Sequence, residues 1–248
     1  MIRIRGLKKR FDRNEVLKGI NLDVLKGETF TIIGGSGSGK SVIFKHIIGL
    51  MKPDDGSIYI EDEDITKLNE NDLFKVVEKF GMVFQSGALF DSLTVGENIL
   101  FGVKGQENMS EEKKEELIEY YLNEVGLTGI SKLFPAELSG GMKKRVAIAR
   151  AIAKQPEIIM FDEPTTGLDP IMADVINELI IKVSRNKKRT SIVITHDMVS
   201  AYKISDRIAM LYDGKIIFVG TPDEVRSTDN DIVSQFINGR SEGPIKIR

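Results

Sequence analysis

Four segments rich in apolar residues recur along the chain, and polar residues follow most of them. The segments are 28–33, 80–84, 157–161 and 189–195, and they contain many β-branched or aromatic residues. Nearly continuous apolar segments of this length are typical of strands that are buried on both faces, as in a parallel sheet covered by helices. Ligands bind beyond the carboxyl ends of the strands in such a sheet, so the polar residues found there are candidates for function.

Alternating patterns are found nearer to the two ends of the chain. Residues 1–5 alternate apolar and basic side chains, which is typical of an edge strand. Alternation resumes at 20–24 after a turn at 12–14, so we expect an antiparallel sheet before the first buried strand. Toward the other end, Asp213-Gly214 lies between two apolar segments and predicts a hairpin with a two-residue turn.

Apolar residues at helical spacing predict helices between the strands. Asn69 can cap a helix that includes 72–77. The segment 111–122 carries many charges of both signs, which predicts an exposed helix with a solvated face.

A further helix is expected at 141–153. Its apolar stripe consists of Val146, Ala149, Ile152 and Ala153. The side chains expected to face water are Lys143, Lys144 and Arg150. We interpret 86–155 as a helical insertion in the sheet domain.

Composition narrows the class of protein. The chain has 248 residues, of which 41% are hydrophobic and 29% charged, enough for one sizeable domain with a full core. The net charge of −2 gives no overall field for nucleic acid, and we interpret the short basic clusters 143–145 and 187–189 as solvated surface. The absence of cysteine excludes disulfides and suits a reducing compartment. We find no long apolar segment and no signal peptide, and therefore expect a cytoplasmic protein whose membrane role would need a partner.

A glycine-rich segment follows the first buried strand and precedes a helix. It matches the phosphate-loop pattern G-x-x-x-x-G-K-[ST] at every fixed position. Its residues are Gly34, Gly35, Ser36, Gly37, Ser38, Gly39, Lys40 and Ser41. Glycines leave no side chain between the backbone amides and an anion, and the helix adds the positive end of its dipole. In this pattern Lys40 contacts the β- and γ-phosphates and the Ser41 hydroxyl ligates Mg²⁺.

Two adjacent carboxylates, Asp162 and Glu163, follow the strand at 157–161. Asp162 suits coordination of Mg²⁺ through water, which this hard cation prefers to keep. Glu163 can accept a proton from the attacking water or orient it. Taken alone, such a pair could equally be two solvated side chains, and the phosphate loop is what favours the functional interpretation.

Polar residues follow two further strands. Gln85 comes after 80–84 and is a candidate contact for the metal or for a water molecule. His196 comes after 189–195, and we expect it to donate a hydrogen bond near the γ-phosphate. The other histidine, His46, lies within the first helix and is interpreted as a packing or surface residue.

Two other features lie far from the phosphate loop in sequence. Ser139, Gly140 and Gly141 begin the helix at 141–153, so they form either a simple helix cap or a second anion site. Phe11 is a single aromatic residue upstream of the loop, and either belongs to the core or stacks on a base.

Together these motifs resemble those of the ABC-type ATPases, in the family's order and over nearly the whole chain. The match covers the family's adenine-stacking aromatic (Phe11), Walker A (34–41), Q-loop (Gln85), signature (138–142), Walker B (158–163), D-loop (166–169) and switch histidine (His196). The resemblance implies an α/β fold with a RecA-like P-loop ATPase core, an antiparallel β-subdomain and an inserted helical subdomain. It implies one ATPase domain over 1–228 and a C-terminal tail at 229–248. That tail is either a frayed terminus or a segment that reaches a second copy.

The resemblance also implies ATP and Mg²⁺ as cofactors and a head-to-tail homodimer. Each ATP would lie between the Walker A motif of one copy and Ser139, Gly140, Gly141 and Asp169 of the other. Met142 is a departure, because the family most often has glutamine there. The Ser-Gly-Gly amides are kept, so we expect catalysis to survive.

A narrower resemblance is to the ATPases of Mla/Mce-type lipid transporters. It is carried by 84–99, by 138–145 with its methionine, and by 236–245. It implies an integral-membrane permease, an Mce-type lipid-binding protein and a small regulatory subunit as partners, at the cytoplasmic face of the bacterial inner membrane. By the same resemblance, 85–98 is the segment on which the permease docks, and lipid moves between the inner and outer membranes.

Two other interpretations stay open. One is the ATPase of an importer of small polar solutes, against which 86–98 and Met142 argue. The other is a non-transporting ABC protein. DNA-repair members would carry long insertions and translation factors two ATPase halves, whereas a cell-division type is harder to exclude from one chain.

Overall fold

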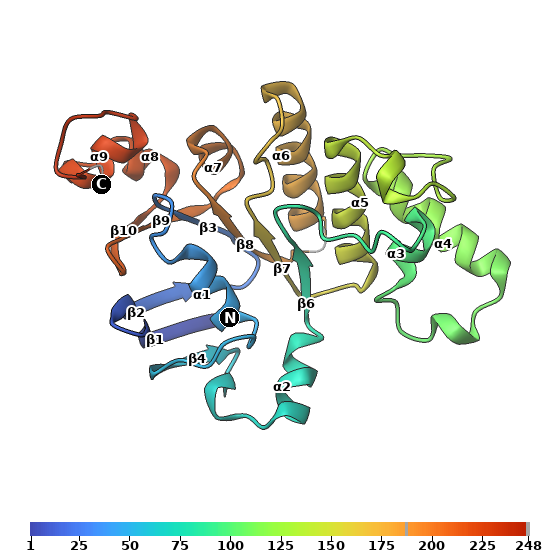
Figure 1. Cartoon of the computed structure of the whole chain (residues 1–248), viewed down its shortest axis with the longest axis horizontal. Coiled ribbons are helices and arrows are strands. Elements are labelled where there is room, and N and C mark those ends of the chain that lie inside the picture. The colour runs from blue at the N-terminus through green and yellow to red at the C-terminus, as the bar shows by residue number, and fades with distance from the viewer. Residues whose placement is uncertain (187, 247–248) are drawn as a thin grey trace.

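A six-stranded sheet forms the centre of the molecule (Figure 1). The computed structural model describes residues 1–186 and 188–246. The strand order is β10-β9-β3-β8-β7-β6, and all neighbouring pairs are parallel except β9 and β10. The strands are β3 (Thr29–Ile33), β6 (Phe80–Val83), β7 (Ile158–Asp162), β8 (Thr190–Thr195), β9 (Arg207–Tyr212) and β10 (Lys215–Gly220). The predicted hairpin is confirmed, because Asp213 and Gly214 join β9 to β10 with φ values of 45° and 73°.

Alternate side chains of the central strands pack on opposite faces of this sheet. One face is covered by α5 (Gly140–Ala153) and α6 (Pro170–Arg185) and, toward β9, by α7 (Met198–Ile204). The other face is covered by α1 (Lys40–Ile47) and by the second sheet. Both faces of β7 and β8 are therefore buried, as their apolar sequences predicted.

The second sheet is antiparallel, with the order β2-β1-β4-β5. Its strands are β1 (Ile2–Phe11), β2 (Asn14–Val24), β4 (Asp55–Ile60) and β5 (Glu63–Asp64). The prediction of an edge strand at 1–5 is wrong, because β1 pairs with β2 on one side and with β4 on the other. The second partner comes from beyond the phosphate loop, so local alternation could not reveal it.

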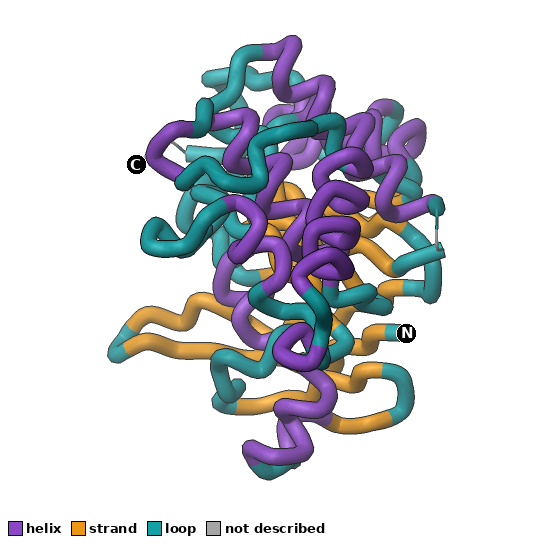
Figure 2. Tube along the Cα trace, turned by 90° about the vertical axis from the view of Figure 1, so that its right-hand side faces the viewer, coloured by secondary structure: helices purple, strands orange, loops and turns teal. Residues whose placement is uncertain are grey.

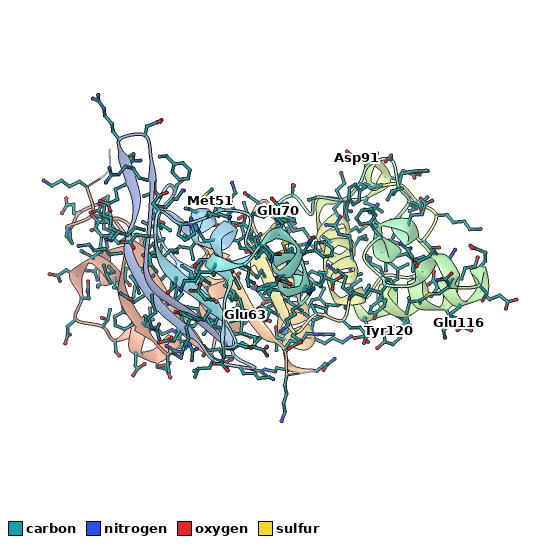
Figure 3. All side chains as sticks on the ribbon, turned by 90° about the horizontal axis from the view of Figure 1, so that it is seen from below. Met51, Glu63, Glu70, Asp91, Glu116 and Tyr120 are labelled. Atoms are coloured by element: carbon teal, nitrogen blue, oxygen red, sulfur yellow. The ribbon has the colours of Figure 1, made fainter. Side chains whose placement is uncertain are left out.

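A helical region lies at one end of the molecule, between β6 and β7 in sequence (Figure 1). It contains α3 (Val95–Leu100), α4 (Glu111–Glu124) and α5, which share one apolar core. Figure 3 places Asp91, Glu116 and Tyr120 of this region apart from Met51 and Glu63. In Figure 2 this end faces the viewer, with strands behind it and below.

The remaining elements are short. Asn69 caps α2 (Glu70–Val77) by accepting a hydrogen bond from the Asp72 amide, as predicted. Two more helices follow the hairpin, α8 (Pro222–Arg226) and α9 (Asp231–Ile237). The 3-10 turns are η1 (Ile65–Lys67), η2 (Gln106–Asn108) and η3 (Pro135–Glu137). No helix among the described residues is both long and apolar enough to cross a membrane.

The segment after α9 folds back on its own chain. Gln235 is 5% exposed, and its side-chain Nε2 donates to the main-chain oxygens of Arg240 and Ile245. The Ile245 amide in turn donates to Gln235 Oε1 over 2.6 Å. Residues 240–245 are therefore attached to α9 by one buried amide.

The helix α5 corrects the prediction that its basic residues face water. Lys144 is 7% exposed, and its Nζ donates to the main-chain oxygen of Glu163. Arg150 donates to the oxygens of Gly87 and Ala88, and burial lowers the pKa of its guanidinium. The helix is buried on more than one side because α3, α4 and α6 all pack on it.

In the basic cluster 187–189, Lys188 is exposed as predicted, but Arg189 differs from the prediction of solvated surface. Arg189 is 7% exposed and donates to the oxygens of Pro156 and Val183. Lys187 lies outside the described residues. Arg189 thus satisfies the carbonyl groups at the end of α6 and before β7, which a count of charges cannot show.

The loop before α3 is held by one buried side chain, Asn98. Its Oδ1 accepts from the Phe90 amide, and its Nδ2 donates to the oxygens of Phe90, Leu93 and Thr94. We expect Asn98→Ala to lower the free energy of unfolding by about 1–3 kcal/mol, because these partly buried groups lose their partner.

Urea denaturation of the full chain measures this effect. Exposed Asn108 is the matched control, and Asn108→Ala should change the free energy of unfolding by less than about 0.5 kcal/mol. If Asn98→Ala lowers the free energy of unfolding no more than Asn108→Ala does, Asn98 does not stabilise the loop.

Candidate active site

The carboxyl ends of β3, β8 and β7 lie side by side at one edge of the central sheet. In the parallel ladders Ile33 pairs with Thr195, and Asp162 pairs with Ile194. The phosphate loop, His196 and Glu163 each follow directly after these residues. Three segments far apart in sequence therefore meet at the edge where ligands bind in such sheets.

The phosphate loop turns sharply between β3 and α1. Gly34 has a φ of 155°, and a Cβ there would collide with the main-chain oxygen of Leu211. Gly39 has a φ of 106° and caps α1, so the backbone at both positions requires glycine. The side chain of Lys40 folds over the loop, with its Nζ 2.7 Å from Gly34 O and 3.0 Å from Gly35 O.

Lys40 and the two carboxylates influence one another electrostatically. Burial lowers the pKa of Lys40, and the charges of Glu163 and Asp162 oppose this change. Burial also raises the pKa of Asp162, and the neighbouring Glu163 raises it further. Such perturbed groups, clustered at a sheet edge, are typical of functional sites.

Two buried polar atoms in this region have no hydrogen-bond partner among the described residues. They are Ser38 Oγ in the loop and Asp162 Oδ1 at the end of β7. Buried polar atoms are rarely left unpaired, so both fit an additional group such as phosphate or hydrated Mg²⁺. Residues 1–186 and 188–246 contain no cluster of three or more histidine or acidic residues that could hold a metal alone. Asp162, beside the phosphate loop, fits Mg²⁺ through the chemistry of its carboxylate, because this ion is commonly bound by one or two carboxylates, waters and substrate phosphates.

Glu163 is held in an unusual backbone conformation. Its φ is 49°, which is uncommon for a residue with a side chain. Its Oε2 lies 2.9 Å from His196 Nδ1 and accepts a hydrogen bond of 3.0 Å from Thr166 Oγ1. The His196 side chain is 60% exposed, so it lies at the mouth of the site.

Other predicted residues surround this centre. Phe11 ends β1 and is 42% exposed, so it is not a core residue. Side chains of β2 pack on Gly39, which brings the β1–β2 hairpin close to the phosphate loop. Gln85 is exposed in the turn after β6, and Ser41 is exposed in the first turn of α1.

The second predicted anion site lies at the start of α5. Ser139 caps this helix by accepting from the Met142 amide, and both Ser139 and Gly140 are exposed. Gly141 is buried beside α6, and a Cβ at this position would collide with the Met172 side chain. Asp169 caps α6 by accepting from the amides of Ile171 and Met172. Ser139 and Gly140 thus face outward on their own chain, whereas Gly141 does not.

Sequence reasoning missed three contacts that contribute to this site, although Thr166 lies within the motif 166–169 named above. Lys144 contacts the Glu163 main chain, and Thr166 contacts its carboxylate. Asp197 accepts from the hydroxyl groups of Thr165 and Ser200, which joins the segment after β7 to the segment after β8. The only signal in the sequence was the position of these polar residues next to the motifs.

Comparison with known proteins agrees with this geometry. The family model described as ABC transporter matches residues 17–166. The chain is 39% identical to the intermembrane phospholipid transport system ATP-binding protein MlaF of Haemophilus influenzae, over all of this chain and 94% of that protein. It is also 39% identical to the L-cystine import ATP-binding protein TcyN of Bacillus subtilis, over 96% of this chain and 92% of that protein.

A solved structure is similar as well. It is the dimeric ATP-binding cassette MJ0796 in a post-hydrolysis state bound to ADP and Pi. Its TM-score is 0.81 at 34% identity, covering 90% of this chain and 99% of that one. This likeness confirms the predicted α/β fold with a RecA-like core. The chain therefore belongs to the ABC transporter family, as one of its ATPases.

Proposed function

We propose that this ATPase powers a transporter that moves phospholipid or another lipid between the inner and outer membranes. The observation that carries the proposal is the similarity to MlaF along the whole chain. The segment 84–99 and Met142 support it, because both resemble that group rather than the importers. The equal identity to TcyN supports the alternative, an importer of small solutes.

The reaction that we propose is hydrolysis of ATP at the carboxyl edge of the sheet. The phosphate-loop amides and Lys40 bind and orient the phosphates. Ser41, Gln85 and Asp162 would hold Mg²⁺, which neutralises charge on the phosphates when it is bound. Glu163 accepts a proton from the attacking water or orients it, and His196 fixes the Glu163 carboxylate through its Nδ1. Phe11 would stack on the adenine.

The complete site requires a second copy of the chain. The exposed Ser139 and Gly140, with the α5 amides, would contact the γ-phosphate held by the partner copy's phosphate loop. Asp169 begins α6 beside them. Closure of such a homodimer depends on contacts that exist only while γ-phosphate is present, and hydrolysis releases them.

The partners follow from the same proposal. A permease would bind the segment 85–98 and hold the ATPase at the cytoplasmic face of the inner membrane. An Mce-type lipid-binding protein and a small regulatory subunit would complete the assembly. Arg150 and Asn98 support this docking site, because they fix the main chain of 87–94 from the protein interior.

Glu163→Gln tests the catalytic assignment. We expect turnover to fall by about 100-fold or more, because the amide can no longer accept the proton. ATP binding should persist, since Lys40 and the loop are unchanged, and an ATP-bound dimer should accumulate in size-exclusion chromatography. The matched control is Glu157→Gln, at the exposed opposite end of β7, which should hydrolyse like the parent. Near-normal turnover of Glu163→Gln would contradict the assignment.

Ser139→Arg tests the shared site. This variant should bind ATP as a monomer but lose hydrolysis, because arginine cannot form the serine's contact with the nucleotide of the second copy. Lys40→Ala should be inactive through its own phosphate loop. A mixed dimer of the two variants retains one composite site with both motifs intact, so mixing should restore part of the activity. Normal hydrolysis by the Ser139→Arg homodimer would rule out the shared arrangement.

Copurification tests the lipid assignment. The full chain is purified with its membrane partner, and the bound small molecules are identified by mass spectrometry. We expect a phospholipid or another lipid to be enriched relative to the same preparation from cells without the ATPase. Stimulation of ATP hydrolysis by a polar solute, with no enriched lipid, would favour the importer instead.

A further inference from the structure

Lys144 is a buried lysine to which the proposed reaction gives no role. It lies in the second turn of α5, and its Nζ donates a hydrogen bond of 3.3 Å to the main-chain oxygen of Glu163. Burial lowers the pKa of the Lys144 ammonium, and the Glu163 carboxylate opposes that change. Burial of an ammonium group costs free energy. Lys144 is therefore unlike a solvated surface lysine, and we ask what its buried contact does.

The main chain of Glu163 is held from three directions. Its positive φ is strained for a residue with a side chain, and such strain persists only where the surroundings over-determine it. The Glu163 amide donates to Ile194 O on β8 over 2.8 Å. The Glu163 oxygen accepts from the Thr166 amide of the following turn and from Lys144 of α5. Lys144 is therefore the contact that joins this peptide to the helical region.

Lys144 donates its hydrogen bond to the Glu163 main chain, whereas the carboxylate is hydrogen-bonded to other groups. The Glu163 Oε2 atom contacts His196 and Thr166 instead. The lysine thus fixes the direction in which the carboxylate is presented. A displacement of α5 would shift that direction without removing any group that would touch the ATP bound by the chain's own phosphate loop.

The same helix begins at the segment proposed to contact the ATP of the second copy. Ser139 precedes Lys144 by five residues, which is about 7.5 Å along a helix. The helix lies beside α6 and continues without glycine or proline after Gly141, so it lacks the residues at which helices commonly kink (Figure 1). Its first turn and Lys144 therefore face two different composite sites.

We propose that Lys144 is a positioning residue, which ties the Glu163 main chain to α5 and so couples hydrolysis in one composite site to nucleotide binding in the other. The proposal rests on the proposed function. When the first turn of α5 engages the partner copy's nucleotide, Lys144 holds Glu163 of its own chain in the orientation that hydrolysis requires. The coupling then appears as cooperativity in ATP.

The test compares three variants of the full chain. Lys144→Met keeps the length of the apolar stem but removes the donor, whereas Lys144→Arg keeps a donor. Lys143→Met is the matched control, because it removes the same charge from the neighbouring position. For each variant we would measure kcat, KM, the Hill coefficient for ATP, equilibrium ATP affinity and the thermal unfolding midpoint.

Lys144→Met should lower kcat by about tenfold to a hundredfold, while ATP affinity stays within about twofold of the parent. Its Hill coefficient should fall toward unity, because occupancy of one site no longer acts on the other. Lys144→Arg should recover part of both quantities, and Lys143→Met should resemble the parent.

Parental kcat and cooperativity in Lys144→Met would overturn the proposal. So would a parent chain without cooperativity, or a loss of kcat that accompanies equal losses of ATP affinity and thermal stability. The Glu163→Gln variant separates this from the proposed function. If Glu163→Gln loses turnover and Lys144→Met does not, the coupling alone is wrong. If Glu163→Gln retains turnover, the proposed function itself is wrong.

Discussion

The parallel register between β3, β8 and β7 is the constraint on which the site depends. It sets Ile33 beside Thr195 and Asp162 beside Ile194, so the residues that follow converge at one edge. A shift of one residue would turn every side chain of the strand to the other face. The buried apolar residues on both faces of β7 and β8 make such a shift costly. Packing energy far from the edge therefore fixes the geometry of the polar residues at it.

Two buried polar atoms at that edge are suited to pairing with a ligand. Lys40 turns back onto the loop carbonyls, while Ser38 Oγ and Asp162 Oδ1 are buried without partners in the described part of the chain. Unpaired buried groups destabilise a fold, so a ligand that pairs with them stabilises it by mass action. A nucleotide that pairs with these two atoms would therefore raise the free energy of unfolding.

Much of this arrangement could be predicted from sequence, because the buried strands and the phosphate loop carry local signals. The apolar segments gave the parallel strands, and Asp213-Gly214 gave the hairpin. Errors arose where a partner is distant in sequence. The β1 strand is not an edge because β4 pairs with it, and Lys144 and Arg189 are buried because neighbouring carbonyl groups accept their hydrogen bonds. The sequence around a charged residue does not show whether a carbonyl group distant in sequence will accept its hydrogen bond.

Arg150 connects α5 to the segment that leads to α3. Its guanidinium holds the oxygens of Gly87 and Ala88, in the turn that leads to α3. Ser139, Lys144 and Arg150 thus mark three points on one helix, about 16 Å from the first to the last. Between Ser139 and Arg150 the helix contains no proline, and its only glycines are Gly140 and Gly141 at its start. The 87–88 turn and the Glu163 main chain are therefore both hydrogen-bonded to one short helix.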